Sequence, residues 1–157
     1  MRRREPALAI VGIGPRARNL VFTGFGMNVY EMTADRNGDL LLGGDNWGVG
    51  QAVKRLAIPT LKLTTVAGAA DGISGRVEGI SQSPDGSLFA LTSAGIIHRI
   101  HEGPLSVTTH FADATNKITT GKDLGLARDG ALYIANRGGW GWGTSIGSTR
   151  RGRSPSR

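Results

Sequence analysis

The sequence contains no cysteine. This absence excludes a disulfide framework and a cysteine-ligated metal, and it is compatible with every cellular compartment. No stretch reaches the roughly 20 apolar residues of a membrane-spanning helix, so we expect no membrane span. The start, "MRRREPALAIVGIG", resembles a signal peptide, but Glu5 and Pro6 interrupt it and no Ala-x-Ala cleavage site follows. We interpret it as a basic N-terminus leading into a first β-strand, and the localisation stays open.

Helical periodicity is missing as well. No window repeats apolar residues at i, i+3, i+4 and i+7, so we expect almost no helix. Glycine, in contrast, is abundant, with 25 of 157 residues. Short apolar runs between glycine-rich turns are typical of an all-β chain.

Aromatic residues are few, at 6%, and the formal net charge of +7 is concentrated at the two ends of the chain. Nucleic-acid binding would require a basic stripe on the folded part, with aromatic side chains for stacking. The middle of the chain is near neutral, so we expect no nucleic-acid partner. The basic end residues are Arg2, Arg3, Arg4, Arg150, Arg151, Arg153 and Arg157.

An internal repeat is the strongest signal in the sequence. Residues 32–44, 80–92 and 124–136 align on Gly38, Gly86 and Gly130, each preceded by Asn or Asp. Residues 52–65 also align with 96–109, and 47–53 with 140–146. In each unit we expect a strand, an Asn/Asp-Gly turn whose two residues supply positive φ, and three further strands. In the second unit these are a strand near Ile80 and strands at 88–91, 96–100 and 105–111.

Four antiparallel strands repeating every 40–50 residues predict the blades of a β-propeller. We therefore predict an all-β propeller fragment of about three four-stranded antiparallel blades. The expected organisation is 1–27 (basic N-terminus and outer strands of a preceding blade), 28–75 (blade), 76–119 (blade), 120–147 (partial blade) and 148–157 (disordered basic tail).

Propellers usually have four to eight blades, so this count raises the question of completeness. The sequence leaves three interpretations open: a truncated or frame-shifted product, a small ring closed within the chain, and a half-ring completed by a partner. Open blade edges would favour self-association.

The meander places candidate site residues on the side opposite the Asn/Asp-Gly turns. First strands begin there and second strands end there, close to the expected axis. Oxygen donors gathered at that mouth could hold Ca²⁺ or another divalent cation, although each could instead cap a turn. The first strands begin with Tyr30, Glu31, Glu78, Lys122 and Asp123, and the second strands end with Asp45, Asn46, Thr92, Ser93, Asn136 and Arg137. The predicted metal ligands are Glu78, Asn136, Asp45 and Asn46.

Trp47, Trp140 and Trp142 lie in glycine-rich loops of the same side. We predict that they bind a ligand together with Arg137, because exposed Trp offers a flat apolar surface, although they could instead fill gaps between blades. The three histidines form no metal or triad signature. His98, in the third strand of its unit, is expected to point outward.

The stretches "EGISQSPDGSLFAL" (78–91) and "KDLGLARDGALYIAN" (122–136) resemble the blade signature of NHL repeats and of the gluconolactonase, senescence-marker-protein and strictosidine-synthase-like propellers. This resemblance implies a propeller, and in the gluconolactonase-like branch a divalent cation that polarises a lactone carbonyl. Glu78-Gly79 matches that branch's Glu-Gly, and Asn136 matches the end of its second strand. Asp123-Leu124 departs from its Asn-Gly. Asp123 is the predicted catalytic carboxylate.

Two functions follow as expectations. The first is an NHL-like binding module that takes a partner protein or small ligand on the loop-bearing side. The alternative is a metal-dependent lactonase-like hydrolase or its inactive remnant.

Overall fold

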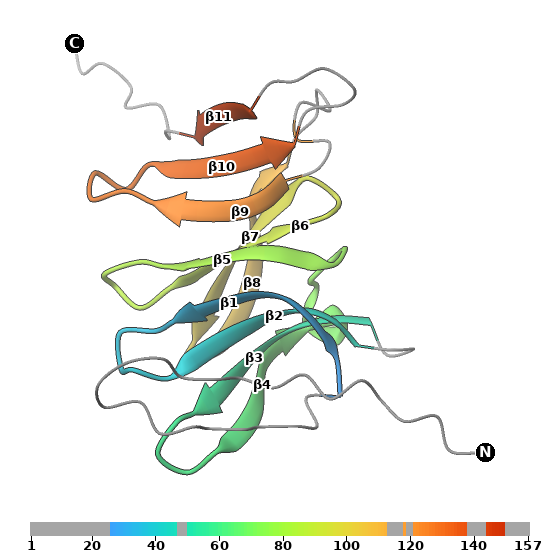
Figure 1. The fold of residues 1–157 in the computed structure, drawn as a ribbon, viewed down its shortest axis with the longest axis vertical. Helices are drawn as coiled ribbons and strands as arrows, with labels where there is room; N and C mark the ends of the chain where they lie inside the picture. Colours follow the sequence, from blue (N-terminus) through green and yellow to red (C-terminus); the bar gives the residue numbers. More distant parts are fainter. Residues whose placement is uncertain (1–25, 47–49, 113–117, 119–120, 138–143, 150–157) are drawn as a thin grey trace.

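The structure, a computed structural model, describes residues 26–46, 50–112, 118, 121–137 and 144–149. These residues form three antiparallel β-sheets (Figure 1). The predicted all-β class is therefore confirmed. Within the described residues, the helical structure is one 3-10 turn at Ala69–Asp71. No helix in this part of the chain has the length and hydrophobicity needed to cross a bilayer.

Chain neighbours pair in every sheet, so each sheet is a meander. Sheet 1 consists of β1 (Asn28–Ala34), β2 (Leu40–Asn46), β3 (Gly50–Ala57) and β4 (Lys62–Gly68). Sheet 2 consists of β5 (Val77–Gln82), β6 (Leu88–Thr92), β7 (Ile96–Glu102) and β8 (Leu105–Ala112). In sheet 3 the described strands are β9 (Gly121–Leu126), β10 (Leu132–Arg137) and β11 (Thr144–Thr149).

The four strands predicted for the second unit are confirmed as β5 to β8, with small differences at their ends. β11 continues to Thr149, two residues past the predicted end of the third unit. Residues 7–25, predicted to hold strands of an earlier unit, and the tail from 150 onward lie outside the described residues.

The Asn/Asp-Gly sequences form the same turn in all three sheets. Gly38, Gly86 and Gly130 have φ of 85, 91 and 81°. Each glycine N–H donates to the carbonyl three residues earlier, at 3.1, 2.9 and 3.0 Å respectively. The expectation that both turn residues take positive φ is wrong, because only the glycine does. The aspartates instead accept a hydrogen bond from the N–H two residues later, at 2.9 Å for Asp85 and 3.0 Å for Asp129.

All three of these turns lie at one end of the sheets, on the left in Figure 1. We call this end the turn side. β2 ends and β3 begins at the opposite end, where the connection from β6 to β7 also lies, and we call this end the loop side. The predicted alternation of connections between two sides is therefore present.

Apolar side chains hold the three sheets together in two layers. β6 is buried on both faces, with Leu88 and Ala90 in the first cluster and Phe89 and Leu91 in the second. This follows from the alternation of side chains along a strand. The first cluster joins sheets 1 and 2 and also includes Leu41, Val53, Ala67, Ile73, Val77, Ile80 and Ile100; the second joins sheets 2 and 3 and also includes Ile97, Leu124, Leu132 and Ile134.

The sheets approach one another through their first strands. β5 contacts β1 and β2 on one side and β9 on the other. A Cβ on Gly79 would lie 2.7 Å from the backbone nitrogen of Leu124, and one on Gly43 would lie 2.6 Å from Cγ1 of Val77. Glycine at these two positions therefore permits the close approach.

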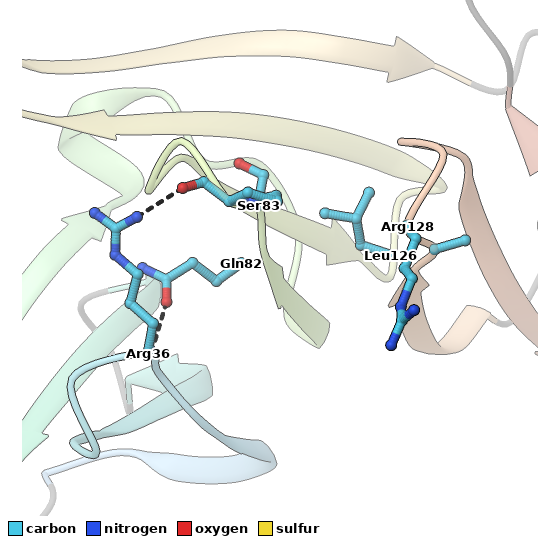
Figure 2. Close-up of a pocket in the computed structure, with 7 residues that line it drawn as sticks. Arg36, Gln82, Ser83, Leu126 and Arg128 are labelled. Carbon is cyan, nitrogen blue, oxygen red and sulfur yellow. Dashed lines mark hydrogen bonds between the residues drawn. The ribbon is translucent and has the colours of Figure 1, made fainter.

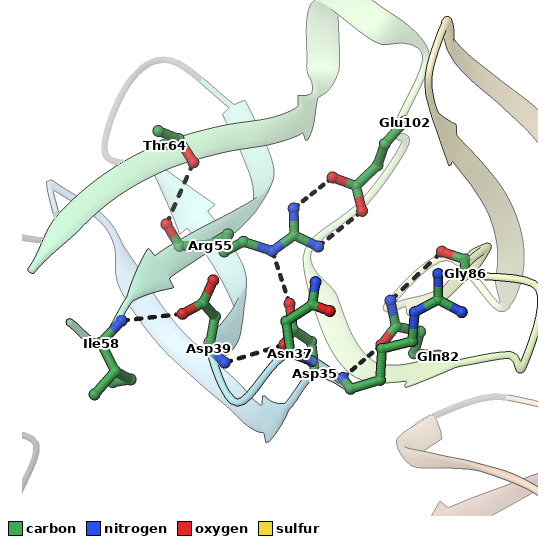
Figure 3. A network of polar contacts seen from close by, with 10 residues as sticks. Asp35, Asn37, Asp39, Arg55, Ile58, Thr64, Gln82, Gly86 and Glu102 are labelled. Carbon is green, nitrogen blue, oxygen red and sulfur yellow. Dashed lines mark hydrogen bonds and ion pairs between the residues drawn. The ribbon is translucent and has the colours of Figure 1, made fainter. Parts of the chain in front are cut away.

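An ion-pair network also joins sheets 1 and 2, on the turn side (Figure 3). Arg55 of β3 donates from Nε to Oδ2 of Asp35 at 2.9 Å, and its two terminal nitrogens donate to the carboxylate of Glu102 at the end of β7. The Asp35 side chain is fully buried. Its Oδ1 accepts the N–H groups of Asn37 at 2.8 Å and Asp39 at 3.0 Å, which fixes the β1–β2 turn.

Candidate functional site

Each first strand has a β-bulge at the same point of the repeat. The unmatched residues are Tyr30 in β1, Glu78 in β5 and Lys122 in β9, each eight positions before its turn glycine. A bulge redirects side chains locally, and bulges are enriched next to active sites. The three bulges lie toward the loop side, where the sequence predicts the site. We take this loop-side region of β1, β5 and β9 as the candidate functional site.

Arg76 connects two of the bulged residues. Its Nε donates to Oε1 of Glu78 at 2.8 Å, and its Nη2 donates to the same oxygen. Its guanidinium carbon lies 4.3 Å from the centroid of the Tyr30 ring, a cation–π distance. Ser93 fixes its backbone, because the Arg76 N–H donates to Oγ of Ser93 and the Ser93 N–H donates to the Arg76 carbonyl. Arg76 therefore links sheet 1 to sheet 2 and neutralises the buried Glu78.

A pair of carboxyl groups lies in the same region. Burial, together with the negative charge of Asp123, raises the pKa of Glu31 to about 7. Glu31, Gly79 and Asp123 are equivalent positions on the three adjacent first strands. Because Gly79 has no side chain, the acids of β1 and β9 interact across β5. Oδ1 of Asp123 accepts the N–H of Leu124 at 2.7 Å.

The raised pKa of Glu31 predicts a pH dependence of stability. Between its ordinary value of 4.5 and about 7, the folded chain holds a proton that the unfolded chain releases. The Glu31 contribution therefore favours folding below about pH 4.5 and is lost as the pH rises toward 7. Glu31→Gln should raise the free energy of unfolding by about 1 kcal/mol at pH 8, a value discounted for partial solvent screening, and change it little at pH 4. Urea denaturation at both pH values measures this difference, and equal effects at the two would contradict it.

The predicted metal ligands are engaged with protein groups. Glu78 is paired with Arg76, and Oδ1 of Asp45 accepts a hydrogen bond from Nδ2 of Asn28 at 2.9 Å. Asn136 is buried at the end of β10 and has an interaction of its own. Asn46 pairs through its backbone with Gly50, and its side chain lies outside the described part.

In the described part of the chain, no group of three or more histidine, cysteine, aspartate or glutamate side chains is arranged to hold a metal ion. A divalent cation stays a prediction from the sequence, and no chemical step is derived through it.

The predicted aromatic ligand surface falls outside the described structure. Trp47, Trp140 and Trp142 are not among the described residues, and Arg137 is described only through its backbone in β10. Their role in ligand binding stays a prediction.

The expected orientation of His98 is wrong. The imidazole is buried, 3% exposed, and its Nε2 lies 3.3 Å from both the N–H and the hydroxyl oxygen of Ser74. Burial lowers the pKa of His98, so the neutral ring serves as a partner within the core. The strand alternation did not reveal this because β7 is covered on both faces.

Two residues of the site have no role assigned from the sequence. The sequence places Glu31 on the loop side but assigns it no function. The repeat alignment could have revealed its role, because Glu31 and Asp123 occupy equivalent positions in their repeats. Arg76 stands just before β5, outside the aligned segments, and its contact with Tyr30 depends on how sheets 1 and 2 pack. No periodic pattern signals that contact.

Comparison with protein-family models found no match, and neither did comparison with curated proteins.

Proposed function

We propose that the three sheets are consecutive blades of a β-propeller of the NHL and gluconolactonase-like type. Three observations support this proposal. First, each sheet repeats the same turn and the same bulge in its first strand. Second, β4 and β8 have equivalent register shifts where they pair with β3 and β7. Third, the sheets approach one another through their first strands. In a propeller the first strands line the central axis, and the loop-side ends of β1, β5 and β9 then form one mouth of the channel.

We infer that this mouth is a binding site for a positively charged group, an ammonium or guanidinium of a small ligand or a partner protein. The interaction of Glu31 with Asp123 is the observation that carries this inference. Two nearby carboxylates repel each other, and a cation between them removes that repulsion. The Arg76 guanidinium over the Tyr30 ring provides an example of a cation accommodated in the same region.

Titration with N-acetyl-lysine amide, followed by NMR chemical shifts, tests the inference. Affinity should rise between pH 5.5 and pH 8, because Glu31 loses its proton across that range. Glu31→Gln and Asp123→Asn should each weaken binding about tenfold or more, the usual effect of losing a charged hydrogen-bond partner. N-acetyl-glutamate amide is the matched control of opposite charge. Equal binding of the two amides would refute a cation site.

The same carboxyl pair favours the alternative, a lactonase-like hydrolase. A carboxyl group with a pKa near 7 is suited to general acid–base catalysis, and Asp123 is the predicted catalytic residue. Adding Ca²⁺ and then a chelator while recording the melting temperature separates the proposals. The hydrolase requires a metal-dependent shift that is lost in Glu78→Gln, together with lactone hydrolysis that is lost in Asp123→Asn. The binding module predicts neither.

A further inference from the structure

A pocket lies on the turn side, at the opposite end of the sheets from the proposed loop-side mouth. Its volume is about 260 Å³. Figure 2 shows Arg36 and Gln82 along one side of it, Leu126 and Arg128 along the other, and Ser83 between them. The pocket is thus built from the turns of all three sheets.

The two arginines come from equivalent positions. Arg36 and Arg128 each stand two residues before the turn glycine of their own sheet, and Pro84 occupies that position in sheet 2. Pro84 has no charge, so the middle turn contributes no third cation at this position. The apolar lining comes from Pro84, Leu126 and Ala127.

Among the described residues, no carboxylate forms an ion pair with either guanidinium. Nη1 of Arg36 donates to the Pro84 carbonyl at 2.7 Å, and its backbone N–H donates to Oε1 of Gln82 at 2.9 Å, so both partners are neutral. Arg128 is exposed, and it has no hydrogen-bond or ion-pair partner among the described residues.

Two of the turn aspartates are already bound by protein groups. Asp35 is bound to Arg55 and to turn amides, while Asp85 is bound to Arg99 at 2.7 Å and to the N–H of Ser87. Each of these two carboxylates therefore pairs with an arginine of its own sheet. The residues that line the pocket include two arginines and no carboxylate.

We propose that this turn-side pocket binds the oxyanion of a small organic molecule, a carboxylate or phosphate attached to a compact apolar body. Guanidinium groups recognise both oxyanions through paired N–H donors. Contacts with the turn of sheet 2 hold Arg36 in place. Arg128, in the turn of sheet 3, would bind the anion from the other side. The apolar lining would contact the body of the ligand.

Chemical-shift titration of the full chain with phenyl phosphate and with benzoate tests the proposal. The compound that binds with the higher affinity identifies the preferred anionic group. We expect saturable shifts at Arg128 and at the turn residues around Ser83. Arg128→Gln should weaken binding about tenfold or more. Its melting temperature should match that of the parent chain, because Arg128 has no partner among the described residues that folding would lose.

Lys62→Gln removes one exposed positive charge from β4 and is the matched control, with an expected change in affinity of less than about twofold. Three results would overturn the proposal: saturation by neither anion, unchanged affinity in Arg128→Gln, or equal losses in the two variants. Shifts confined to the loop side would also overturn it.

Discussion

Gly79→Ala is expected to lower the free energy of unfolding by roughly 1–3 kcal/mol or more, the usual range for an added methyl group in a packed interior. The new Cβ would lie 2.7 Å from the backbone nitrogen of Leu124 and 3.0 Å from the carbonyl carbon of Asp123. Both are backbone atoms, so no side-chain rotation relieves the contact. β9 must move away from β5, which also disturbs the hydrogen bond from the Ser81 hydroxyl to the Leu124 carbonyl.

Gly125→Ala is the matched control, because Gly125 also lies in a first strand and a Cβ there meets nothing within 4 Å. Alanine reduces the conformational freedom of the unfolded chain, so this substitution should be neutral or should stabilise by about 0.5–1 kcal/mol. Urea denaturation of both variants gives the comparison. A Gly79 variant as stable as the Gly125 variant would show that β5 and β9 do not pack at this distance.

Arg55→Leu has the second large expected effect, a destabilisation of about 3–5 kcal/mol. The change leaves the buried carboxylate of Asp35 without its cationic partner and removes both donors to Glu102 across the interface of sheets 1 and 2. Combining Arg55→Leu with Asp35→Asn should recover part of the loss, because the amide carries no charge to leave unpaired.

The repeat supplies a control for this substitution. Arg99 is the equivalent residue of sheet 2, 44 positions further along the chain. It pairs with Asp85, whose side chain is 56% exposed, whereas that of Asp35 is fully buried. Arg99→Leu should therefore cost less than about 1 kcal/mol. Similar losses in the two variants would mean that burial of the carboxylate does not determine the strength of the pair.

Much of the fold could be predicted from the sequence, because local patterns determine it. The Asn/Asp-Gly turns define strand ends, and the short continuous apolar run in "LFALT" is typical of a strand that is buried on both faces. The 44-residue offset was equally informative. It aligns Val66 of β4 with His110 of β8, and these are the unmatched residues in the two equivalent register shifts.

The site was predicted less completely, because its interactions depend on side-chain partners and strand packing that the repeat pattern does not specify. Glu78 and Asp45 read as free oxygen donors in the sequence, yet Arg76 and Asn28 bind them. The influence of Asp123 on Glu31 requires that β1, β5 and β9 lie in order with a glycine between the two acids. The turn-side pocket likewise depends on how three turns meet, which no single segment encodes.

The titration of Glu31, observed by carbon NMR at its carboxyl group, tests most directly the claim that β1 and β9 share one site across β5. The account predicts a pKa near 7 in the parent chain. In Asp123→Asn that pKa should fall, yet stay above its ordinary value because the burial remains. An ordinary pKa in the parent chain, or one that Asp123→Asn leaves unchanged, would contradict the shared site.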